Sequence, residues 1–438
     1  MRDPTARTVA RHARLGNTGS VSLQIDAVSH GRGEGAAARH TARMPEGVAD
    51  TAAIPAELLE APVEEDRRVT SLELFFDLVF VFAITQVSGL VSVHATWVRL
   101  LQGLAILAVL WFAWTGYAWL GNTANAEEGV MRVMLLSAMA AMLIASLAVP
   151  RAFGADALTF GIAYFAVRFL HVATYTAVAR RQRDPELAGA VGRLASTILP
   201  AAALLVLAGA VDGPARTACW IAAIAVDYGG IMARGIEGWR VHPGHFAERH
   251  GLVIIIALGE SIVSLGVGAG KLPLGVGVIV AALLGIAVAA ALWWAYFDVV
   301  ALVAERRLRS ASARAQALMA RDSYSYLHLP MVVGIIAFAI GVKRTLPELH
   351  AHLGIVPASA LCGGVALYLV SLSAFKRRNI GSFNRQRLVA AALLLALIPV
   401  ATAVSALLAL ALVAAVSCGL IAFEVTRYTE TRRRIRHG

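Results

Sequence analysis

Charged residues are scarce in this sequence, and cysteine is scarcer still. Only 15% of the 438 residues are Asp, Glu, Lys or Arg, whereas about 25% is usual for a soluble domain. The three cysteines, Cys219, Cys362 and Cys418, lie in apolar runs without a CxxC pair, which argues against a disulfide framework or a cysteine zinc site. Because 58% of the residues are hydrophobic, the composition predicts a polytopic membrane protein.

Sequence motifs of soluble enzymes are also missing. The chain has no G-x-S-x-G nucleophile motif and no dinucleotide fingerprint. The stretch 266–273 (GVGAGKLP) resembles a phosphate loop, but Leu265 replaces its first glycine and Leu272 its Ser or Thr. The stretch 242–250 (HPGHFAERH) carries three histidines without an H-E-x-x-H pattern, and we interpret it as a solvated, pH-sensitive loop. We therefore expect no catalytic residue, cofactor or metal ion.

The two ends of the chain differ from its centre. Residues 1–66 are rich in Ala, Arg, Gly, Thr and Pro and show no apolar period, which predicts a disordered cytoplasmic tail. This stretch has no apolar h-region, so it is not a secretory signal peptide. An alternative is that the true chain begins at Met44. Residues 431–438 form a basic C-terminal tail that is suited to anionic lipid.

From residue 71 onward, apolar runs recur that are long enough to cross about 30 Å of hydrocarbon as helices. We expect an all-α membrane protein with about twelve transmembrane helices. They are predicted near 71–93, 98–120, 131–150, 158–180, 193–210, 216–234, 251–268, 274–298, 324–342, 356–375, 388–404 and 406–426. The last two are joined so tightly that a broken or re-entrant pair is an alternative.

Lys and Arg alternate strongly between the two sides of this topology. With the N-terminus inside, the cytoplasmic connections include the clusters KRRNIGSFNRQR and RYTETRRRIRHG, whereas the opposite side holds single residues such as Arg99 and Arg151. This bias predicts a protein of the cell (inner) membrane with both termini in the cytoplasm. It also accounts for the net charge of +11, so nucleic acid is not an expected partner.

An internal duplication is visible in the apolar runs. The stretch 78–86 (LVFVFAITQ) aligns with 252–260 (LVIIIALGE). This alignment predicts two six-helix repeats, 67–238 and 239–430. An even number of helices per repeat gives both repeats the same orientation, so their pseudo-two-fold axis would run along the membrane normal.

Four blocks in order carry a resemblance to a known family. They are SLELFFDLVFVFAITQ, ERHGLVIIIALGESIVSLG, WWAYFD at 293–298 and YLHLPMVVGIIAFAIG at 326–341. Together they resemble the signature blocks of the bacterial low temperature requirement A family of multi-pass membrane proteins. The resemblance covers about 350 residues and implies a multi-pass membrane protein named for a cold-growth phenotype.

A second resemblance concerns the start of the first span. Arg68, Phe75 and Asp77 are similar to the R-x(6)-F-S-D motif of a potassium-channel family built from two six-helix repeats. Phe76 stands where that motif has serine, and Gly251 stands where the acid would align in the second repeat. These departures count against potassium conduction.

Several charged residues lie within the predicted spans. Glu73 and Asp77 are four residues apart and share one helical face. A carboxylate inside a membrane helix is costly, which makes both residues candidates for an ion or substrate path. The alternative for Glu73 is a helix cap at the membrane interface, where negative charge is favourable.

The fourth predicted span carries a polar stripe. Tyr164, Arg168, His171 and Tyr175 follow one another at helical spacing and therefore face one direction. An arginine at mid-membrane needs an acidic partner, and the candidates are residues 77, 227 and 260. The alternative to a functional role is an ion pair that holds the bundle together.

The intramembrane charges are unequal in this interpretation. Asp77, Asp227 and Glu260 face only Arg168, so at least one acid must be protonated, bind a cation or face water. This excess favours cations or protons over anions. His328 is a further candidate, although it is more often a hydrogen-bonded core histidine than a proton relay.

These observations predict a transporter or channel for a cation or a proton-coupled solute rather than an enzyme. The expected partners are the lipid bilayer and a small cation, proton or small solute, and homo-oligomerisation is compatible with this view. The alternative class is a non-transporting membrane protein, either a membrane-embedded enzyme or a factor for stability or sensing in the cold. A transporter needs a hydrated path to Glu260 and Arg168, whereas a structural protein would bury them dry and fully paired.

Overall fold

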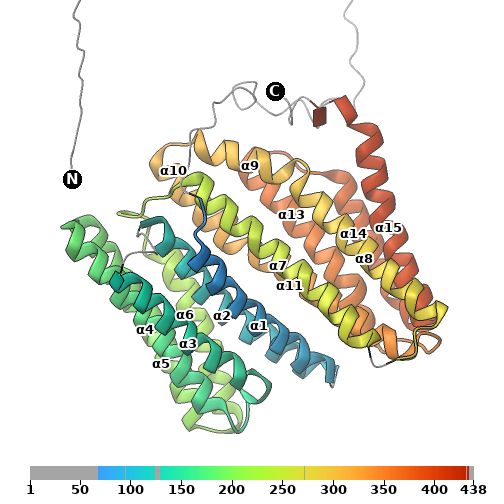
Figure 1. Ribbon diagram of the computed structural model, residues 1–438, viewed down its shortest axis with the longest axis horizontal. Coiled ribbons are helices and arrows are strands. Elements are labelled where there is room, and N and C mark those ends of the chain that lie inside the picture. Colours follow the sequence, from blue (N-terminus) through green and yellow to red (C-terminus); the bar gives the residue numbers. More distant parts are fainter. Residues whose placement is uncertain (1–67, 94, 124–128, 271, 431, 434–438) are drawn as a thin grey trace, which may run out of the picture. The chain divides into compact units, whose positions relative to one another are not determined.

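The computed structural model describes residues 68–93, 95–123, 129–270, 272–430 and 432–433, so the tail expected at 1–66 and most of the basic tail lie outside them. The described residues are almost entirely helical and contain no strand (Figure 1). This confirms the all-α prediction. Long apolar helices are the expected architecture of a membrane-spanning chain, because every backbone group is satisfied within its own segment.

The helices up to residue 233 follow the predicted spans closely. In chain order they are α1 (Ser71–Val93), α2 (Trp97–Thr123), α3 (Gly129–Ala148), the 3₁₀ turn η2 (Val149–Arg151), α4 (Ala157–Gln182), α5 (Pro185–Ala210) and α6 (Gly213–Ala233).

The later helices are more often extended or interrupted. They are α7 (Pro243–Ala269), α8 (Val276–Phe297), α9 (Val300–Arg309), α10 (Ala313–Met319), the π-helical segment η3 (Ala320–Tyr326), α11 (His328–Thr345), the 3₁₀ turn η4 (Leu346–Glu348), α12 (Ile355–Ala358), the π-helical segment η5 (Ser359–Gly363), α13 (Gly364–Ile380), α14 (Arg385–Ala403) and α15 (Ala406–Arg427).

Within the described residues, eleven helical segments are long and apolar enough to cross a membrane. Helix α6 is the one expected span outside this set. Its 21 residues would reach about 31 Å at 1.5 Å per residue, but Arg216, Asp227 and several small residues lower its hydropathy. Helices α14 and α15 each qualify as a span and are separated by only two residues.

Helices α5 and α7 begin eight residues before their predicted spans, and the predicted span 324–342 belongs to a helical segment that begins at Ala313. Helix α5 begins at Pro185, where the Asp184 side chain accepts a hydrogen bond from the Leu187 N–H at 3.0 Å, an N-cap with proline at the first helical position. Helix α7 begins at Pro243 instead of residue 251. The expected solvated loop at 242–250 was therefore wrong, because Pro243 starts a helix that continues directly into the apolar run.

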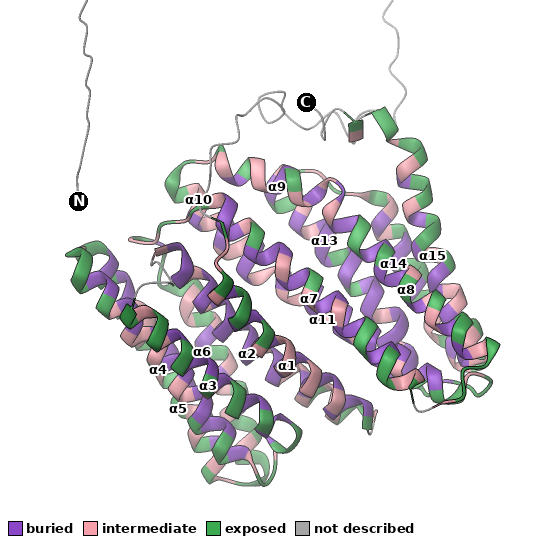
Figure 2. Cartoon of the chain, viewed as in Figure 1, coloured by how far each residue is buried: buried purple, intermediate pink, exposed green. Residues whose placement is uncertain are grey.

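Burial separates central from peripheral helices (Figure 2). The spans Ala313–Glu348 and Ile355–Ile380 are 67% and 72% buried, against 28% for Arg385–Ala403. Large apolar side chains such as Val133 and Leu283 stay more than 60% exposed on outer faces. Such faces are unsuited to water and match a hydrocarbon solvent, which is consistent with membrane insertion.

Candidate functional site

Helices α1 and α7 run side by side in the same direction. Three polar contacts between them join residues that are each 172 positions apart. A constant separation means that the two helices are parallel and in register. Every carboxylate that the sequence analysis singled out on these two helices lies along this contact.

Arg249 is buried in the α1–α7 contact, which the sequence analysis did not anticipate. Its side chain is 1% exposed, and its Nη2 donates to Asp77 Oδ1 at 2.8 Å. Trp114 Nε1 on α2 donates to the same oxygen at 2.8 Å. The sequence analysis counted Arg249 as a loop residue because it placed the start of α7 too late. Asp77 therefore has its own cationic partner and does not contact Arg168.

Glu73 combines a helix cap with an ion pair. Its Oε2 accepts from the Thr70 N–H at 2.9 Å, while the Thr70 hydroxyl receives the Glu73 N–H at 3.3 Å. This is a capping box, as the alternative reading of Glu73 anticipated. His245 Nε2 also lies 3.1 Å from Glu73 Oε1, and Arg249 Nη1 lies 3.6 Å from it. Across the described residues, no group of three or more His, Cys, Asp or Glu side chains could hold a metal ion.

Glu260 lies deeper in the α1–α7 contact and is held by hydroxyl groups. Thr85 Oγ1 donates to Oε2 at 2.6 Å, and Ser88 Oγ and Ser264 Oγ donate to Oε1 at 2.5 and 3.0 Å. The residue is 2% exposed, and no ion pair joins it to a described cation. Arg168 was a candidate partner in the sequence analysis, but it pairs elsewhere.

The partner of Arg168 is Asp227. Arg168 Nη2 on α4 donates to Asp227 Oδ1 on α6 at 2.7 Å, and both side chains are at most 3% exposed. Arg168 Nη1 donates to the Phe112 carbonyl on α2 at 2.7 Å. The contacts of Arg168 therefore join α2, α4 and α6. Of the three acids that the sequence left open as its partner, the structure selects Asp227.

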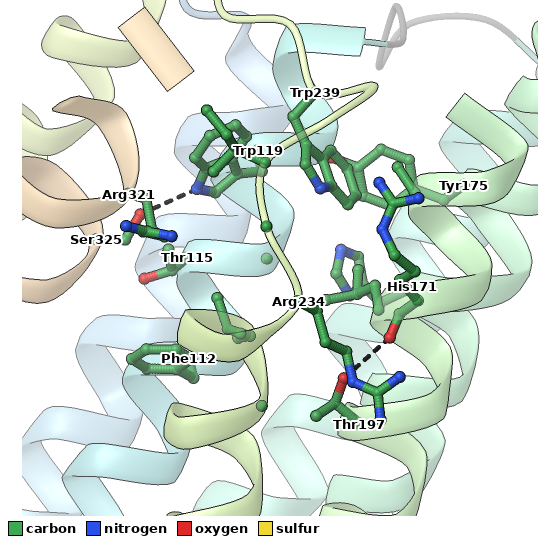
Figure 3. Close-up of a pocket in the computed structure, with 18 of the residues that line it drawn as sticks. Phe112, Thr115, Trp119, His171, Tyr175, Thr197, Arg234, Trp239, Arg321 and Ser325 are labelled. Carbon is green, nitrogen blue, oxygen red and sulfur yellow. Dashed lines mark hydrogen bonds between the residues drawn. The ribbon is translucent and has the colours of Figure 1, made fainter. Parts of the chain in front are cut away.

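A cavity of about 90 Å³ opens beside this ion pair (Figure 3). It lies among α2, α4, α5, α6, the connection that follows α6, and η3. Its polar and aromatic lining consists of Phe112, Thr115, Trp119, Arg168, His171, Tyr175, Arg193, Thr197, Arg234, Trp239, Arg321, Ser325 and Tyr326. Figure 3 shows Thr115, Arg321 and Ser325 on one side of this space and His171, Thr197 and Arg234 on the other.

Five of the 18 buried side-chain atoms that have no hydrogen-bond partner within the described residues belong to residues that line this cavity. They are Thr115 Oγ1, Arg168 Nε, both ring nitrogens of His171 and the Tyr175 hydroxyl. Each of the four residues is at most 4% exposed. Buried polar groups in proteins are normally satisfied, and these five atoms are directed to a space that is large enough to hold a polar occupant. Three of the four belong to the stripe predicted on the fourth span.

Gly116 brings the His171 ring against α2. A Cβ atom at Gly116 would lie 2.6 Å from His171 Cε1, closer than real Cβ contacts allow. The ring also packs against Tyr117 and Tyr175, with centroids 5.1 Å away in both cases. The imidazole is therefore held in place by Gly116 and by the two tyrosine rings.

The π-helical segment η3 is the contribution of the later helices to this cavity. Trp111 Nε1 and Trp119 Nε1 on α2 donate to the Ser325 carbonyl and hydroxyl at 2.7 and 2.9 Å. The Tyr326 hydroxyl donates to the Tyr228 carbonyl on α6 at 2.7 Å. Single π segments inside longer helices frequently occur at functional sites, because they release backbone groups from the helical ladder.

His328 lies outside this cavity and is fully hydrogen bonded. Its Nδ1 is 3.1 Å from the Ser323 carbonyl and its Nε2 is 2.8 Å from the Tyr296 hydroxyl. Since a carbonyl only accepts, Nδ1 carries the proton and Nε2 accepts from the tyrosine. This arrangement agrees with the core-histidine reading.

Sequence reasoning anticipated Arg168, His171 and Tyr175 but not the other residues of the cavity. Among those it missed are three arginines, Arg193, Arg234 and Arg321, which it had assigned to cytoplasmic connections. No local pattern distinguishes a loop arginine that faces a cavity from one that faces water. The one available signal was the proximity of Arg234 to the end of a span that already carried Asp227.

This fold and site define a multi-span helical membrane protein with a cavity inside the bundle whose mainly apolar wall carries several polar side chains. Residues 68–422 match the bacterial low temperature requirement A protein family, and the chain belongs to that family. An uncharacterized protein of Rhizobium meliloti (strain 1021) is 28% identical over 319 residues, which are 70% of this chain and 76% of the relative. No solved structure matches the chain.

Proposed function

We propose that the protein is a transporter or channel of the cell membrane that couples solute movement to a cation or to protons. The observation that carries this proposal is the cluster of unpartnered buried polar atoms on the cavity at Arg168 and His171. A protein that used these residues only to hold helices together would pair them. Polar groups kept without partners inside a bundle are instead the feature of a path for polar solutes.

The proposed architecture has twelve transmembrane helices in two parallel repeats, α1 to α6 and α7 to α15. The repeats would match α1 with α7, α2 with α8, α3 with α11, α4 with α13, α5 with α14 and α6 with α15. In support, the packed neighbours follow the same order in both sets: first with second and third, third with fourth, fourth with fifth, fifth with sixth, and second with sixth.

Local features recur at matching places in these sets. The fourth helix of each ends with two arginines and a left-handed residue, Arg183 at φ 52° and Gly381 at φ 84°. The fifth helix of each contains an internal proline, Pro200 or Pro399. The α1–α7 contact joins residues 172 apart, close to the spacing of 174 between Leu78 and Leu252 in the internal alignment (252 − 78). These recurrences support a duplicated six-helix unit.

The orientation follows from the arginine distribution. In this proposal α6 also spans the membrane, both termini are cytoplasmic and the cavity opens toward the cytoplasm. Positively charged residues favour the cytoplasmic side, and Arg193 and Arg234 would lie at that side of the cavity.

The coupling ion is assigned to the α1–α7 contact. Along it Glu73 and Asp77 contact Arg249 and His245, and Glu260 lies deeper, so three carboxylates accompany one arginine. Glu260 has hydroxyl partners but no described cation. A buried carboxylate held only by hydroxyl groups can take up and release a proton or a small cation without breaking an ion pair.

The alternative is a non-transporting membrane protein, including a membrane-embedded enzyme or a cold-growth factor. Its structural prediction is that Arg168 and Glu260 are dry and fully paired. Arg168 instead lines a cavity and keeps an unpartnered Nε, which favours transport. Glu260 is buried and hydrogen bonded through both oxygens away from this cavity, as the alternative expects.

The test is ion flux in vesicles that contain the purified protein. A trapped pH-sensitive dye would report protons, and a potassium diffusion potential set with valinomycin would supply the driving force. We expect protein-dependent acidification or alkalinisation that is lost in Glu260→Gln but kept in Glu348→Gln, a matched loss of an exposed carboxylate. The proposed function would be overturned if the protein adds no proton flux under this potential and no Na⁺ or K⁺ flux in parallel assays without valinomycin.

A further inference from the structure

The charge of the cavity is the opposite of what the intramembrane carboxylates predicted. Four arginines line it, Arg168, Arg193, Arg234 and Arg321, and no Asp or Glu is among its lining residues. The carboxylates lie elsewhere, along the α1–α7 contact or behind Arg168. The excess of intramembrane carboxylates over arginine that the sequence indicated therefore does not apply to the lining of the cavity.

Two of these arginines are already neutralised. Arg168 pairs with Asp227 at 2.7 Å, and Arg321 Nε lies 2.8 Å from Asp322 Oδ1. The other two have neutral partners. Arg234 Nη1 donates to the Ser196 hydroxyl at 2.5 Å, and Arg193 Nη2 donates to the Glu237 carbonyl.

No ion pair within the described residues neutralises Arg193 or Arg234. The Glu237 carboxylate lies beside Gly235 and pairs with Arg314, with its Oε1 3.2 Å from Nη1. Arg193 is half-buried and Arg234 is exposed, so the cavity has two arginines without an ion pair on its solvent-facing side. A guanidinium group presents several N–H donors in a fork that matches carboxylate and phosphate oxygens.

The inner part of the cavity adds further hydrogen-bond donors that suit an oxyanion. Thr115 Oγ1, Arg168 Nε and one His171 nitrogen can each donate a hydrogen bond and have no described acceptor. Aromatic rings of Phe112, Trp119 and Trp239 form much of the remaining wall. At about 90 Å³, the space holds roughly six waters or one solute of that size.

We infer that this cavity binds a small oxyanion, a solute with a carboxylate or phosphate group, between the arginines 193 and 234 and the donors of Thr115, Arg168 and His171. The inference rests on the proposed function in one respect, since it makes this anion the transported solute. Anion binding through the arginines and ion coupling through Glu260 would then use separate parts of the bundle.

Binding is tested on the purified full-length protein in detergent, with sodium acetate and sodium phosphate as probes at constant ionic strength. Thermal unfolding and tryptophan fluorescence serve as readouts, since Trp119 and Trp239 line the cavity. We expect saturable stabilisation by at least one probe and a dissociation constant raised roughly tenfold or more in Arg193→Gln and in Arg234→Gln, because each removes a charge-assisted contact. Arg240→Gln is the matched control, because its side chain is 74% exposed and does not line the cavity.

Three outcomes would overturn this inference: no saturable effect of either probe on the wild type, unchanged binding in both cavity variants, or an equal loss in Arg240→Gln. Unfolding temperatures without anion show whether each variant is folded.

Nanodiscs with phosphatidylcholine alone or with added phosphatidylglycerol distinguish the source of the oxyanion. Displacement of the probe by phosphatidylglycerol would assign the cavity to a lipid headgroup and overturn the solute assignment.

The two proposals fail separately. Anion binding without any ion flux in vesicles would leave the site in place and overturn transport. Proton flux that depends on Glu260, together with an absence of anion binding, would overturn only the anion site.

Discussion

Arg168 Nη2 and Asp227 Oδ1 are 2.7 Å apart in the interior of the bundle. They connect α4 to α6, and Arg168 lines the cavity of about 90 Å³ beside them. The pair leaves one guanidinium nitrogen, Nε, without a described partner. One residue thus serves both the packing of α6 and the lining of the cavity. Loss of Arg168 should therefore affect both the packing of α6 and the cavity.

Neutralising one member of this pair should destabilise the protein strongly. Arg168→Gln or Asp227→Asn leaves an uncompensated buried charge, which costs roughly 3–5 kcal/mol. The double variant strands no charge and should regain a large part of that loss. Thermal or denaturant unfolding of the purified protein measures the coupling energy as a double-mutant cycle. Strictly additive losses would contradict the pair as we describe it.

Glu260→Gln should fold normally and lose ion-driven flux. The amide keeps the shape of the carboxylate, and the hydroxyl groups of Thr85, Ser88 and Ser264 can rotate to accept or donate. We expect a change in unfolding free energy of about 1 kcal/mol, the scale of one neutral hydrogen bond. Flux in reconstituted vesicles is the measurement. Wild-type flux in this variant would return Glu260 to a structural role.

Arg249→Gln should be far more damaging than Arg240→Gln, although both remove one arginine near the start of α7. Arg249 is 1% exposed and neutralises Asp77 at 2.8 Å, so its loss strands a buried carboxylate at roughly 3–5 kcal/mol. The side chain of Arg240 is 74% exposed, and exposed ion pairs contribute at most about 1 kcal/mol. Unfolding temperatures of the two variants give the comparison. Equal temperatures would show that Arg249 is solvated, as the sequence alone suggested.

Gly334→Ala should destabilise the contact between α11 and α13. A Cβ atom at Gly334 would lie 2.6 Å from the Gly364 carbonyl oxygen, which belongs to a backbone that cannot rotate away. Overpacking of this kind costs roughly 1–3 kcal/mol. Gly259→Ala on α7 is the control, because nothing lies within 4 Å of the added atom, and it should be neutral or stabilising by up to about 1 kcal/mol. The reverse ranking in thermal unfolding would contradict this packing.

The span formed by α6 can be tested with topology reporters. A reporter inserted after residue 211 and another after residue 238 flank this helix. If α6 crosses the membrane, the two should report opposite sides, with residue 238 cytoplasmic. Reports from the same side would end the twelve-helix topology and with it the six-helix repeat.

The sequence by itself determined that the chain is a helical membrane protein, which family it resembles, and where most helices lie. These properties depend on local composition and on the length of apolar runs, and α1 was predicted at 71–93, the bounds that the structure has. The polar stripe on α4 was equally visible, because a helical period fixes which residues share a face. The α7 start was missed, since Pro243 and the following polar residues look like a loop until the helix is seen to continue through them.

Only the tertiary structure decided which charges meet. Three acids were open as partners of Arg168, and packing selected Asp227 on α6, while Asp77 pairs with Arg249 across α1 and α7. The cavity was equally hidden, because it is lined by residues as distant in sequence as Thr115 and Ser325. The charge count along the chain indicated a cation, whereas the lining of the cavity carries arginines. Electrostatic selectivity depends on distances of a few ångströms in space, and the order of residues along the chain does not contain them.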